Sequence, residues 1–211
     1  MMTVRFCQLH QLIIKSADLA GDCTPMSRAD LWNKRYLDRN RAIPSLPDAL
    51  QRSLAALPAG RTLDLACGDG AASLYLAENG HRVVAVDFAI EGLQRLQGFA
   101  AQRQLTIETQ EIDLSAEQSL AALSGEFDNI VLLRYRPESS LLQQLSARMK
   151  PAARLLIQTF NLEQHRQTGF PERFCLQPDE LSQALPELTL EAYDNGQLEG
   201  SVFDRYLFVM P

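Results

Sequence analysis

Two glycines and three aspartates between positions 64 and 113 have the spacing of a nucleoside-binding site. Gly68 and Gly70 follow the apolar run LDLAC, where glycines let a turn of backbone approach a ligand closely. Asp87 follows the next apolar run, VVAV, about twenty residues later, which is the spacing of a carboxylate that accepts hydrogen bonds from ribose hydroxyls. Asp64 and Asp113 supply further carboxylates near the ends of neighbouring strands. These residue types predict binding chemistry for a nucleoside cofactor.

The glycine spacing separates two kinds of nucleotide cofactor. An NAD site uses a third glycine for close helix–strand packing and rests a pyrophosphate on the helix N-terminus. Ser73 stands at that third-glycine position here. S-adenosylmethionine has no phosphate, and its positive sulfonium suits a cleft that contains several carboxylates. Asp64 has a polar role near the turn, and Asp113 is placed to meet an adenine amino group. The residues favour S-adenosylmethionine and leave an NAD-binding Rossmann oxidoreductase as the alternative.

Alternating strands and helices must hold these residues in place. Continuous apolar runs such as LDLA, VVAV and IVLL are typical of parallel strands that helices cover on both faces. The alternation predicts strands at 61–67, 82–87, 105–110, 127–133, 154–160, 188–193 and 203–210. Helices are predicted at 30–39, 48–57, 71–79, 90–102, 115–123, 139–149 and 177–185, with a polar loop after residue 160. The predicted fold class is α/β: a doubly wound, seven-stranded, mostly parallel sheet with an antiparallel C-terminal strand.

Composition and charge narrow the possible functions. The formal net charge is −6 and the arginines are scattered, so the chain lacks the basic stripe that is typical of nucleic-acid binding. The 4 cysteines are far apart, which predicts no zinc site and no other metal site, and suits a reducing cytoplasm. No apolar run reaches the length of a membrane span. We expect a cytoplasmic protein with a single domain over 26–211, preceded by a leader over 1–25.

Four segments resemble the motifs of class I S-adenosylmethionine-dependent methyltransferases. LDLACGDG resembles the first motif of that family, VVAVDFA the second, EIDL the third and FDNIVLL the fourth. More narrowly, TLDLACGDGAASLYLAENGHRV, TGFPERF and DELSQAL resemble the tellurite-resistance methyltransferases, small bacterial enzymes that are also similar to thiopurine S-methyltransferase. The resemblance implies a Rossmann-like methyltransferase fold, S-adenosylmethionine as the cofactor and a small-molecule methyl acceptor.

The resemblance also implies roles for individual residues in binding the cofactor. The methionine part would contact the first-strand turn, the ribose would contact the end of the second strand, and the adenine would lie beside the end of the third. The amino-terminal helix would close the site and contact the cofactor carboxylate, and the residue after the fourth strand would line the cofactor. In this sequence the first-strand turn corresponds to Asp64, Ala66, Gly68 and Gly70, the end of the second strand to Asp87 and Phe88, and the end of the third to Asp113 and Leu114. The helix contacts correspond to Arg35 and Tyr36, and the residue after the fourth strand is Arg134.

Substrate contacts are predicted at the end of the fourth strand and in the loop after the fifth. Tyr135 and Arg136 face the transferred methyl group in this fold, and His165 is a candidate general base. The tellurite-resistance members carry a Leu-His-Arg triplet where this chain has Leu198-Glu199-Gly200, so a basic pair suited to an anionic substrate is absent. A non-catalytic protein that binds S-adenosylmethionine stays open as an alternative, as do a monomer and a homodimer.

Overall fold

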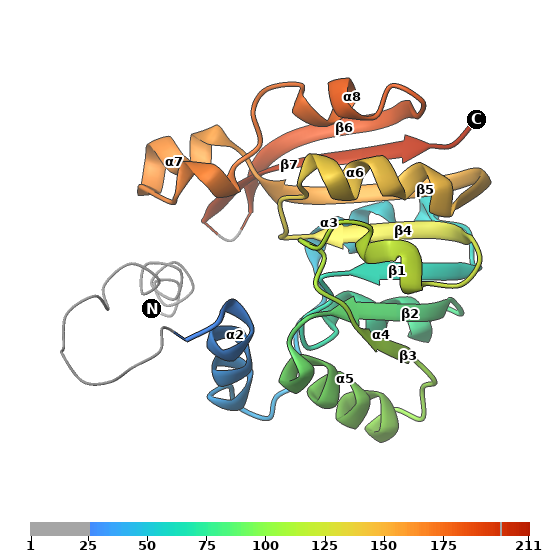
Figure 1. The fold of residues 1–211 in the computed structure, drawn as a ribbon, viewed down its shortest axis with the longest axis vertical. Helices are drawn as coiled ribbons and strands as arrows, with labels where there is room; N and C mark the ends of the chain where they lie inside the picture. The colour runs from blue at the N-terminus through green and yellow to red at the C-terminus, as the bar shows by residue number, and fades with distance from the viewer. Residues whose placement is uncertain (1–25, 199) are drawn as a thin grey trace.

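The protein is described here from a computed structural model, which covers residues 26–198 and 200–211 (Figure 1). The predicted leader over 1–25 lies outside these described residues. The described part contains one sheet of seven strands in the order β3-β2-β1-β4-β5-β7-β6. The strands are β1 (Arg61–Leu65), β2 (Arg82–Asp87), β3 (Glu108–Glu111), β4 (Phe127–Leu133), β5 (Met149–Phe160), β6 (Thr189–Leu198) and β7 (Ser201–Val209).

The pairing of the strands confirms the predicted fold class. Strands β1 to β5 pair in parallel, and β7 runs antiparallel to both β5 and β6. The order of the strands reverses at β1: β2 and β3 lie on one side of it, and β4 and β5 lie on the other. This reversal creates the switch point where doubly wound folds bind ligands. The antiparallel C-terminal strand was predicted, but it lies inside the sheet and β6 forms the edge.

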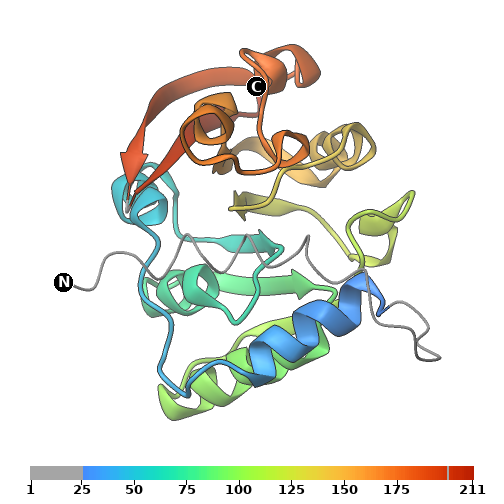
Figure 2. The same cartoon turned by 90° about the vertical axis from the view of Figure 1, so that its left-hand side faces the viewer.

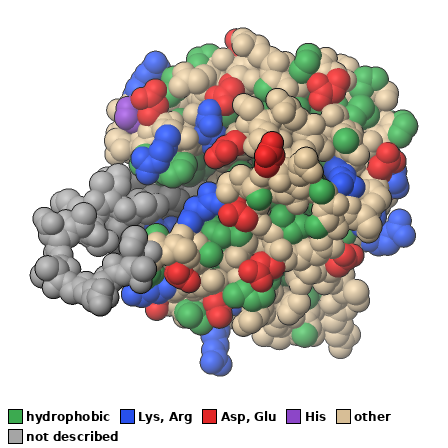
Figure 3. Space-filling view, viewed as in Figure 1, with side chains coloured by type: hydrophobic (Ala, Val, Ile, Leu, Met, Phe, Trp, Pro, Cys, Tyr) green, Lys and Arg blue, Asp and Glu red, His purple; other side chains and the backbone are tan. Residues whose placement is uncertain are grey.

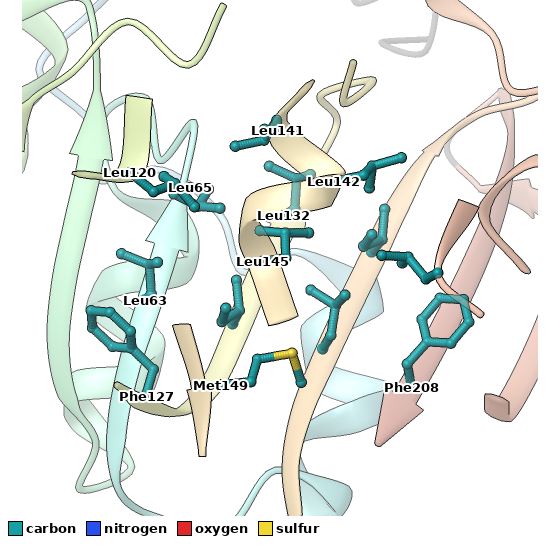
Figure 4. Packing of buried hydrophobic residues seen from close by; sticks show 14 of the residues in the cluster. Leu63, Leu65, Leu120, Phe127, Leu132, Leu141, Leu142, Leu145, Met149 and Phe208 are labelled. Atoms are coloured by element: carbon teal, nitrogen blue, oxygen red, sulfur yellow. The ribbon is translucent and has the colours of Figure 1, made fainter. Parts of the chain in front are cut away.

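Helices cover both faces of the sheet. The α-helices are α2 (Arg28–Leu37), α3 (Asp48–Ser53), α4 (Ala71–Glu78), α5 (Ile90–Gln102), α6 (Ser139–Leu145), α7 (Leu162–Thr168) and α8 (Glu180–Ala184). Leucines of α6 and α8 pack on one face of the sheet together with Leu63 and Leu65 of β1 (Figure 4). Leucines of α3, α4 and α5 pack on the other face, against Val83 and Val131. Because side chains alternate along a strand, β1 directs Asp64 to this second face.

Three segments differ in kind from the sequence prediction, and the bounds of several other elements shift, most at β5, which begins at Met149 rather than at 154. The predicted helix at 115–123 is only a 3₁₀ turn over Ser119–Ala122, because Gln118 adopts a left-handed backbone (φ 59°) that breaks a continuous helix. The predicted loop after residue 160 contains α7, which Asn161 caps by accepting hydrogen bonds from two backbone N–H groups. The predicted turn over 194–201 mostly belongs to a longer hairpin, in which Gly196 pairs with Phe203.

No helix among residues 26–198 and 200–211 is long and apolar enough to cross a membrane. On the face shown in Figure 3, basic and acidic side chains are interspersed without a basic stripe.

The turn between β1 and α4 is shaped by left-handed backbone. Ala66, Gly68 and Gly70 have φ values of 55°, 59° and 88°. A Cβ atom at Gly70 would lie 2.2 Å from Cδ1 of Leu96, a fully buried side chain of α5. The absence of a side chain at Gly70 therefore lets α4 begin directly against α5.

Asp64 lies inside β1 and is 2% exposed. Its Oδ2 accepts a hydrogen bond of 2.5 Å from Oγ of Ser73 in α4. Burial raises the pKa of Asp64 to about 7; the Ser73 hydrogen bond opposes this and the nearby Asp87 carboxylate adds to it. Ser73, at the position where an NAD site carries its third glycine, therefore has a clear polar role: it provides a hydrogen bond to a buried carboxyl group.

We expect Gly70→Ala to destabilise the fold more than Gly80→Ala. Both glycines have positive φ, so each new Cβ introduces strain of about 1–2 kcal/mol. Gly80 has open space around its Cα, whereas Gly70 faces Leu96, so overpacking adds about 1–3 kcal/mol. Urea unfolding of the two variants measures the difference. Equal losses would contradict the packing role of Gly70.

The raised pKa of Asp64 predicts a pH-dependent stability difference between wild type and Asp64→Asn. Between about pH 4 and pH 7 the folded chain keeps a proton on Asp64 that the unfolded chain has released, so the free energy of unfolding falls as pH rises. The wild type should lose up to about 1.4 kcal/mol per pH unit relative to Asp64→Asn in this window. Urea unfolding at several pH values tests this. Parallel pH profiles would show that Asp64 ionises normally.

Candidate cofactor and acceptor site

Asp87 joins the loops that follow the first two strands. Its Oδ2 accepts a hydrogen bond of 2.8 Å from the backbone N–H of Gly68, and its Oδ1 accepts one of 2.8 Å from the N–H of Ala89. Burial raises the pKa of this carboxyl group, while the backbone hydrogen bonds oppose the shift. The predicted ribose-binding acid is thus held by backbone N–H groups of the glycine turn and of the loop after β2.

A cavity of about 250 Å³ opens at the carboxyl ends of the central strands. Part of its wall comes from the turn after β1, with Asp64, Ala66, Cys67 and Asp69. Another part comes from α2. The lining of the cavity therefore contains four of the predicted cofactor-binding residues: Tyr36, Asp64, Ala66 and Arg134.

The far wall of this cavity is aromatic. Phe160 ends β5 and pairs in the sheet with Phe203 near the start of β7, and their ring centroids lie 4.7 Å apart. Phe170, after α7, packs against Phe160 at 4.5 Å between centroids. Gln164 of α7 also lines the cavity, and its Oε1 accepts a hydrogen bond of 2.7 Å from the N–H of Val202. The wall is therefore tied to the sheet by α7.

Helix α2 covers the other side of the cavity. Tyr36 is 5% exposed, and its hydroxyl lies 2.6 Å from where a Cβ of Gly68 would be. Trp32 of the same helix and Arg39, which lies two residues beyond its end, also line the cavity, and the Arg39 guanidinium pairs with Asp69 at 2.9 Å. Burial raises the pKa of the Tyr36 hydroxyl above its usual range and that of the Cys67 thiol likewise, so both stay protonated at neutral pH.

Several predicted cofactor contacts lie outside this cavity, on the side of β2 and β3. Asp113 follows β3, and its Oδ1 accepts hydrogen bonds from the backbone and side chain of Ser115. Leu114, beside it, is buried in the core. Phe88 follows Asp87 and has the Arg28 guanidinium 5.0 Å from its ring centroid. Arg28 also contacts Asp113, so Phe88 and Asp113 lie on one side of the sheet, and their predicted contacts with adenosine stay predictions.

Arg35 does not line the cavity; its guanidinium lies over the ring of Trp32 at 4.7 Å. The predicted cofactor carboxylate contact through Arg35 stays a prediction.

None of the three predicted substrate-contacting or basic residues is among the described residues that line the cavity. Tyr135 is half-buried against the core, and burial raises its pKa. Arg136 donates hydrogen bonds to the carbonyl of Cys175 and to the Glu180 carboxylate, which fixes the segment before α8. His165 has Nδ1 at 2.7 Å from the carbonyl oxygen of Phe170. Their catalytic roles stay predictions.

Sequence reasoning missed most of the aromatic wall and the cavity side of α2. Trp32, Arg39, Phe160, Gln164 and Phe203 line the cavity without having been assigned to it. One signal was present for α7: Asn161 and Gly169 are typical helix-capping residues and bracket the segment that carries Gln164.

The residues present suit S-adenosylmethionine. The turn carries two glycines and no lysine, and Asp64, Asp69 and Asp87 bring three carboxyl groups to it, which suits a cationic ligand better than a pyrophosphate. Within the described ranges, no group of three His, Cys, Asp or Glu residues could hold a metal ion.

Comparison with known families and proteins agrees with this geometry. A family model described as a methyltransferase domain matches residues 37–193. A 2-heptyl-1-hydroxyquinolin-4(1H)-one methyltransferase of Mycobacteroides abscessus is 39% identical over 72 residues, 34% of this chain and 31% of its own length. A ubiquinone biosynthesis O-methyltransferase of Xanthomonas oryzae pv. oryzae is 33% identical over 112 residues, 50% of this chain and 45% of its own length. The chain thus matches less than half the length of either relative.

Solved structures share the fold at low sequence identity. TehB from Haemophilus influenzae is similar with a TM-score of 0.64 and 21% identity, over 87% of this chain and 67% of that one. The N-methyltransferase NodS from Bradyrhizobium japonicum, in complex with S-adenosyl-L-homocysteine, is similar with a TM-score of 0.68 and 18% identity, over 88% of this chain and 100% of that one. The family match spans most of the chain and answers the open choice between cofactors. The chain belongs to the methyltransferase domain family, that of the class I S-adenosylmethionine-dependent methyltransferases.

Proposed function

We propose that this chain transfers a methyl group from S-adenosylmethionine to a small-molecule acceptor that carries an aromatic ring. One observation carries the proposal: a single cavity joins the carboxylates of the glycine turn to the wall formed by Phe160, Phe170 and Phe203. A donor and an acceptor held in such a cavity lie next to each other. The alternative of a non-catalytic protein that binds the cofactor is an outcome of the test below.

The cofactor half of the site is assigned to the loops after the first strands. Asp87 would accept hydrogen bonds from the ribose, Asp113 would accept one from the adenine amino group, and the turn at Gly68 would contact the methionine part. When bound, S-adenosylmethionine supplies a methyl group on a positively charged sulfur that is a good leaving group. Asp64 lines the cavity and, when it is ionised, attracts a positive charge at short range, whereas Asp69 is paired with arginines.

The acceptor half is assigned to the aromatic wall. Planar rings pack against aromatic side chains with favourable edge and face contacts. Its neighbours Leu46, Pro47 and Leu133 are also apolar, so this half excludes water and orients a ring by shape. Holding two reactants in the right orientation can lower a barrier by about 7–11 kcal/mol. Orientation is therefore the main contribution that we assign to this chain.

The acceptor is expected to bring its own nucleophilic electron pair. The cavity residues that titrate come from α2 and the residues just after it, from β1 and the turn after it, and from the residue after β4: Tyr36, Arg39, Asp64, Cys67, Asp69 and Arg134. Tyr36 and Cys67 stay protonated, Asp69 is paired with arginines, and Asp64 is buried and bonded to Ser73. None of these is a ready general base, so an acceptor that is ionised or has a free electron pair at neutral pH suits the site best.

The names of two relatives agree with a small-molecule acceptor: one is named for a hydroxyquinolone and the other for ubiquinone biosynthesis. The apolar wall and the sequence Leu198-Glu199-Gly200 argue against an oxyanion such as tellurite.

Labelled S-adenosylmethionine tests the proposal directly. The purified chain is incubated with methyl-labelled cofactor and a cell extract, which is then split into small-molecule and macromolecular fractions. We expect label in the small-molecule fraction, in compounds that absorb as aromatic rings. Label in protein or RNA would overturn the acceptor class, and cofactor binding without any transfer would support the non-catalytic alternative.

We expect Phe203→Leu to weaken binding of the acceptor without weakening binding of the cofactor. Ring-to-ring contacts contribute about 0.5–1.5 kcal/mol beyond burial, so KM for an aromatic acceptor should rise roughly two- to tenfold. Phe99→Leu is the matched control, because Phe99 is equally buried but packs on α4 and does not line the cavity. Steady-state kinetics give KM, and calorimetry gives the affinity for S-adenosylmethionine. An equal effect of both substitutions would contradict the acceptor role of the wall.

A further inference from the structure

Helix α2 is tied to the cofactor side of the sheet by polar contacts at both ends and in the middle. At its start, Nη2 of Arg28 lies 2.6 Å from Oδ1 of Asp113 and 2.7 Å from Oγ of Ser115. The same guanidinium lies 5.0 Å from the centroid of the Phe88 ring. Arg28 therefore bridges the amino-terminal helix to the two loops that are assigned to adenosine.

The middle contact joins α2 to α5, which lie side by side in Figures 1 and 2. The backbone N–H of Glu91 donates a hydrogen bond of 3.0 Å to Oδ1 of Asn33. Ala89, the residue before α5, has no side chain that could cap the helix. Asn33 thus satisfies, from another helix, an N–H group in the first turn of α5, which a capping side chain would otherwise do.

The end contact holds α2 over the glycine turn. Arg39, two residues beyond the last residue of α2, pairs with Asp69, and Tyr36 in the last turn of the helix rests against Gly68. Together the three contacts run from the adenine side of the cleft to the methionine side, and α2 spans the whole cofactor site. A cofactor bound beneath α2 would be covered by the helix that these contacts hold.

The resemblance to the methyltransferases already implies that α2 closes over the cofactor as a lid; we propose that Arg28 is a positioning residue that presents Asp113 to the adenine amino group and holds α2 closed through the same contact. The inference rests on the proposed use of S-adenosylmethionine. The three hydrogen bonds described for Asp113, from Arg28 and from the backbone and side chain of Ser115, all end on Oδ1. Oδ2 of the same carboxylate is the atom that would accept from adenine. Arg28 thereby orients the carboxylate and closes the lid with one contact.

The ion pair between Arg28 and Asp113, the tether of this lid, stabilises the closed position of α2 only slightly, so the helix can still open. The side chains of Arg28 and Asp113 are 50% and 49% exposed. Exposed ion pairs of this kind change an equilibrium by up to about fivefold and are screened by salt. The apparent affinity for a ligand scales with the fraction of closed molecules, so loss of Arg28 should reduce affinity by a similar factor.

Trp32 provides the measurement. It is the only tryptophan of the 211 residues, it lies on α2, and it lines the cavity. Stopped-flow tryptophan fluorescence can therefore follow the binding of S-adenosylhomocysteine and its release without any methyl transfer. We compare wild type with Arg28→Ala and Arg28→Lys, and use Lys34→Ala as the control, since Lys34 is an exposed cation on the same helix. Thermal unfolding checks that each variant is folded.

We expect Arg28→Ala to weaken binding about three- to fivefold, mainly through faster release, because the tether opposes opening of the lid. Arg28→Lys should recover part of the loss, and Lys34→Ala should bind like wild type. Added NaCl should speed release from the wild type more than from Arg28→Ala, since the variant has lost one screened ion pair.

A second ligand separates positioning from simple loss of structure. S-inosylhomocysteine carries a carbonyl oxygen where S-adenosylhomocysteine has the adenine amino group. If Arg28 acts through Asp113, Arg28→Ala should reduce the preference for the adenine ligand; an equal loss for both ligands would overturn the positioning role. Unchanged or tighter binding by Arg28→Ala would overturn the tethered lid. Failure of the wild type to bind S-adenosylhomocysteine would instead refute the proposed function itself.

Discussion

The cofactor side of the structure depends on one carboxylate with two backbone donors. Asp87 accepts the N–H of Gly68 with one oxygen and the N–H of Ala89 with the other. The first donor belongs to the turn after β1 and the second to the loop after β2, so the two loops are fixed relative to each other. The turn has left-handed backbone at Ala66 and Gly68, which costs free energy, and a charge-assisted hydrogen bond helps to offset that cost.

The same arrangement concentrates negative charge. Asp64 and Asp87 are almost fully buried near each other, and each has a raised pKa whose largest cause is burial. Asp69 is nearby but pairs with Arg39 and Arg95. A buried carboxylate without a cationic partner is unfavourable, so a positively charged ligand gains more here than it would at the surface. The carboxylates that make the turn recognisable in sequence are thus the ones that favour a sulfonium compound.

Much of this could be predicted from sequence because local and long-range signals agree. The strands β2 and β4 and the helix α5 were predicted with the bounds that the structure has, since each is a strongly periodic run between clear breaks. The helix predicted at 115–123 is wrong because its backbone is redirected at Gln118, where composition gives no warning. The aromatic wall could not be predicted from sequence spacing, because Phe160 and Phe203 meet only through the antiparallel pairing of β5 with β7.

The proposed cofactor and acceptor halves of the cavity share parts of the chain. Helix α2 supplies Trp32 and Tyr36 to the cavity, and the same helix reaches Asp113 on the adenine side. The sheet and its aromatic wall are held by packing and by backbone pairing, whereas α2 is held mainly by side-chain contacts at its surface. Since packed β-structure opens far less readily than a helix with exposed tethers, the part that moves should be α2. An acceptor that rests on the aromatic wall would then meet a cofactor that α2 covers from the opposite side. The methyl group would lie between a rigid surface, the aromatic wall on the sheet, and a more mobile one, helix α2.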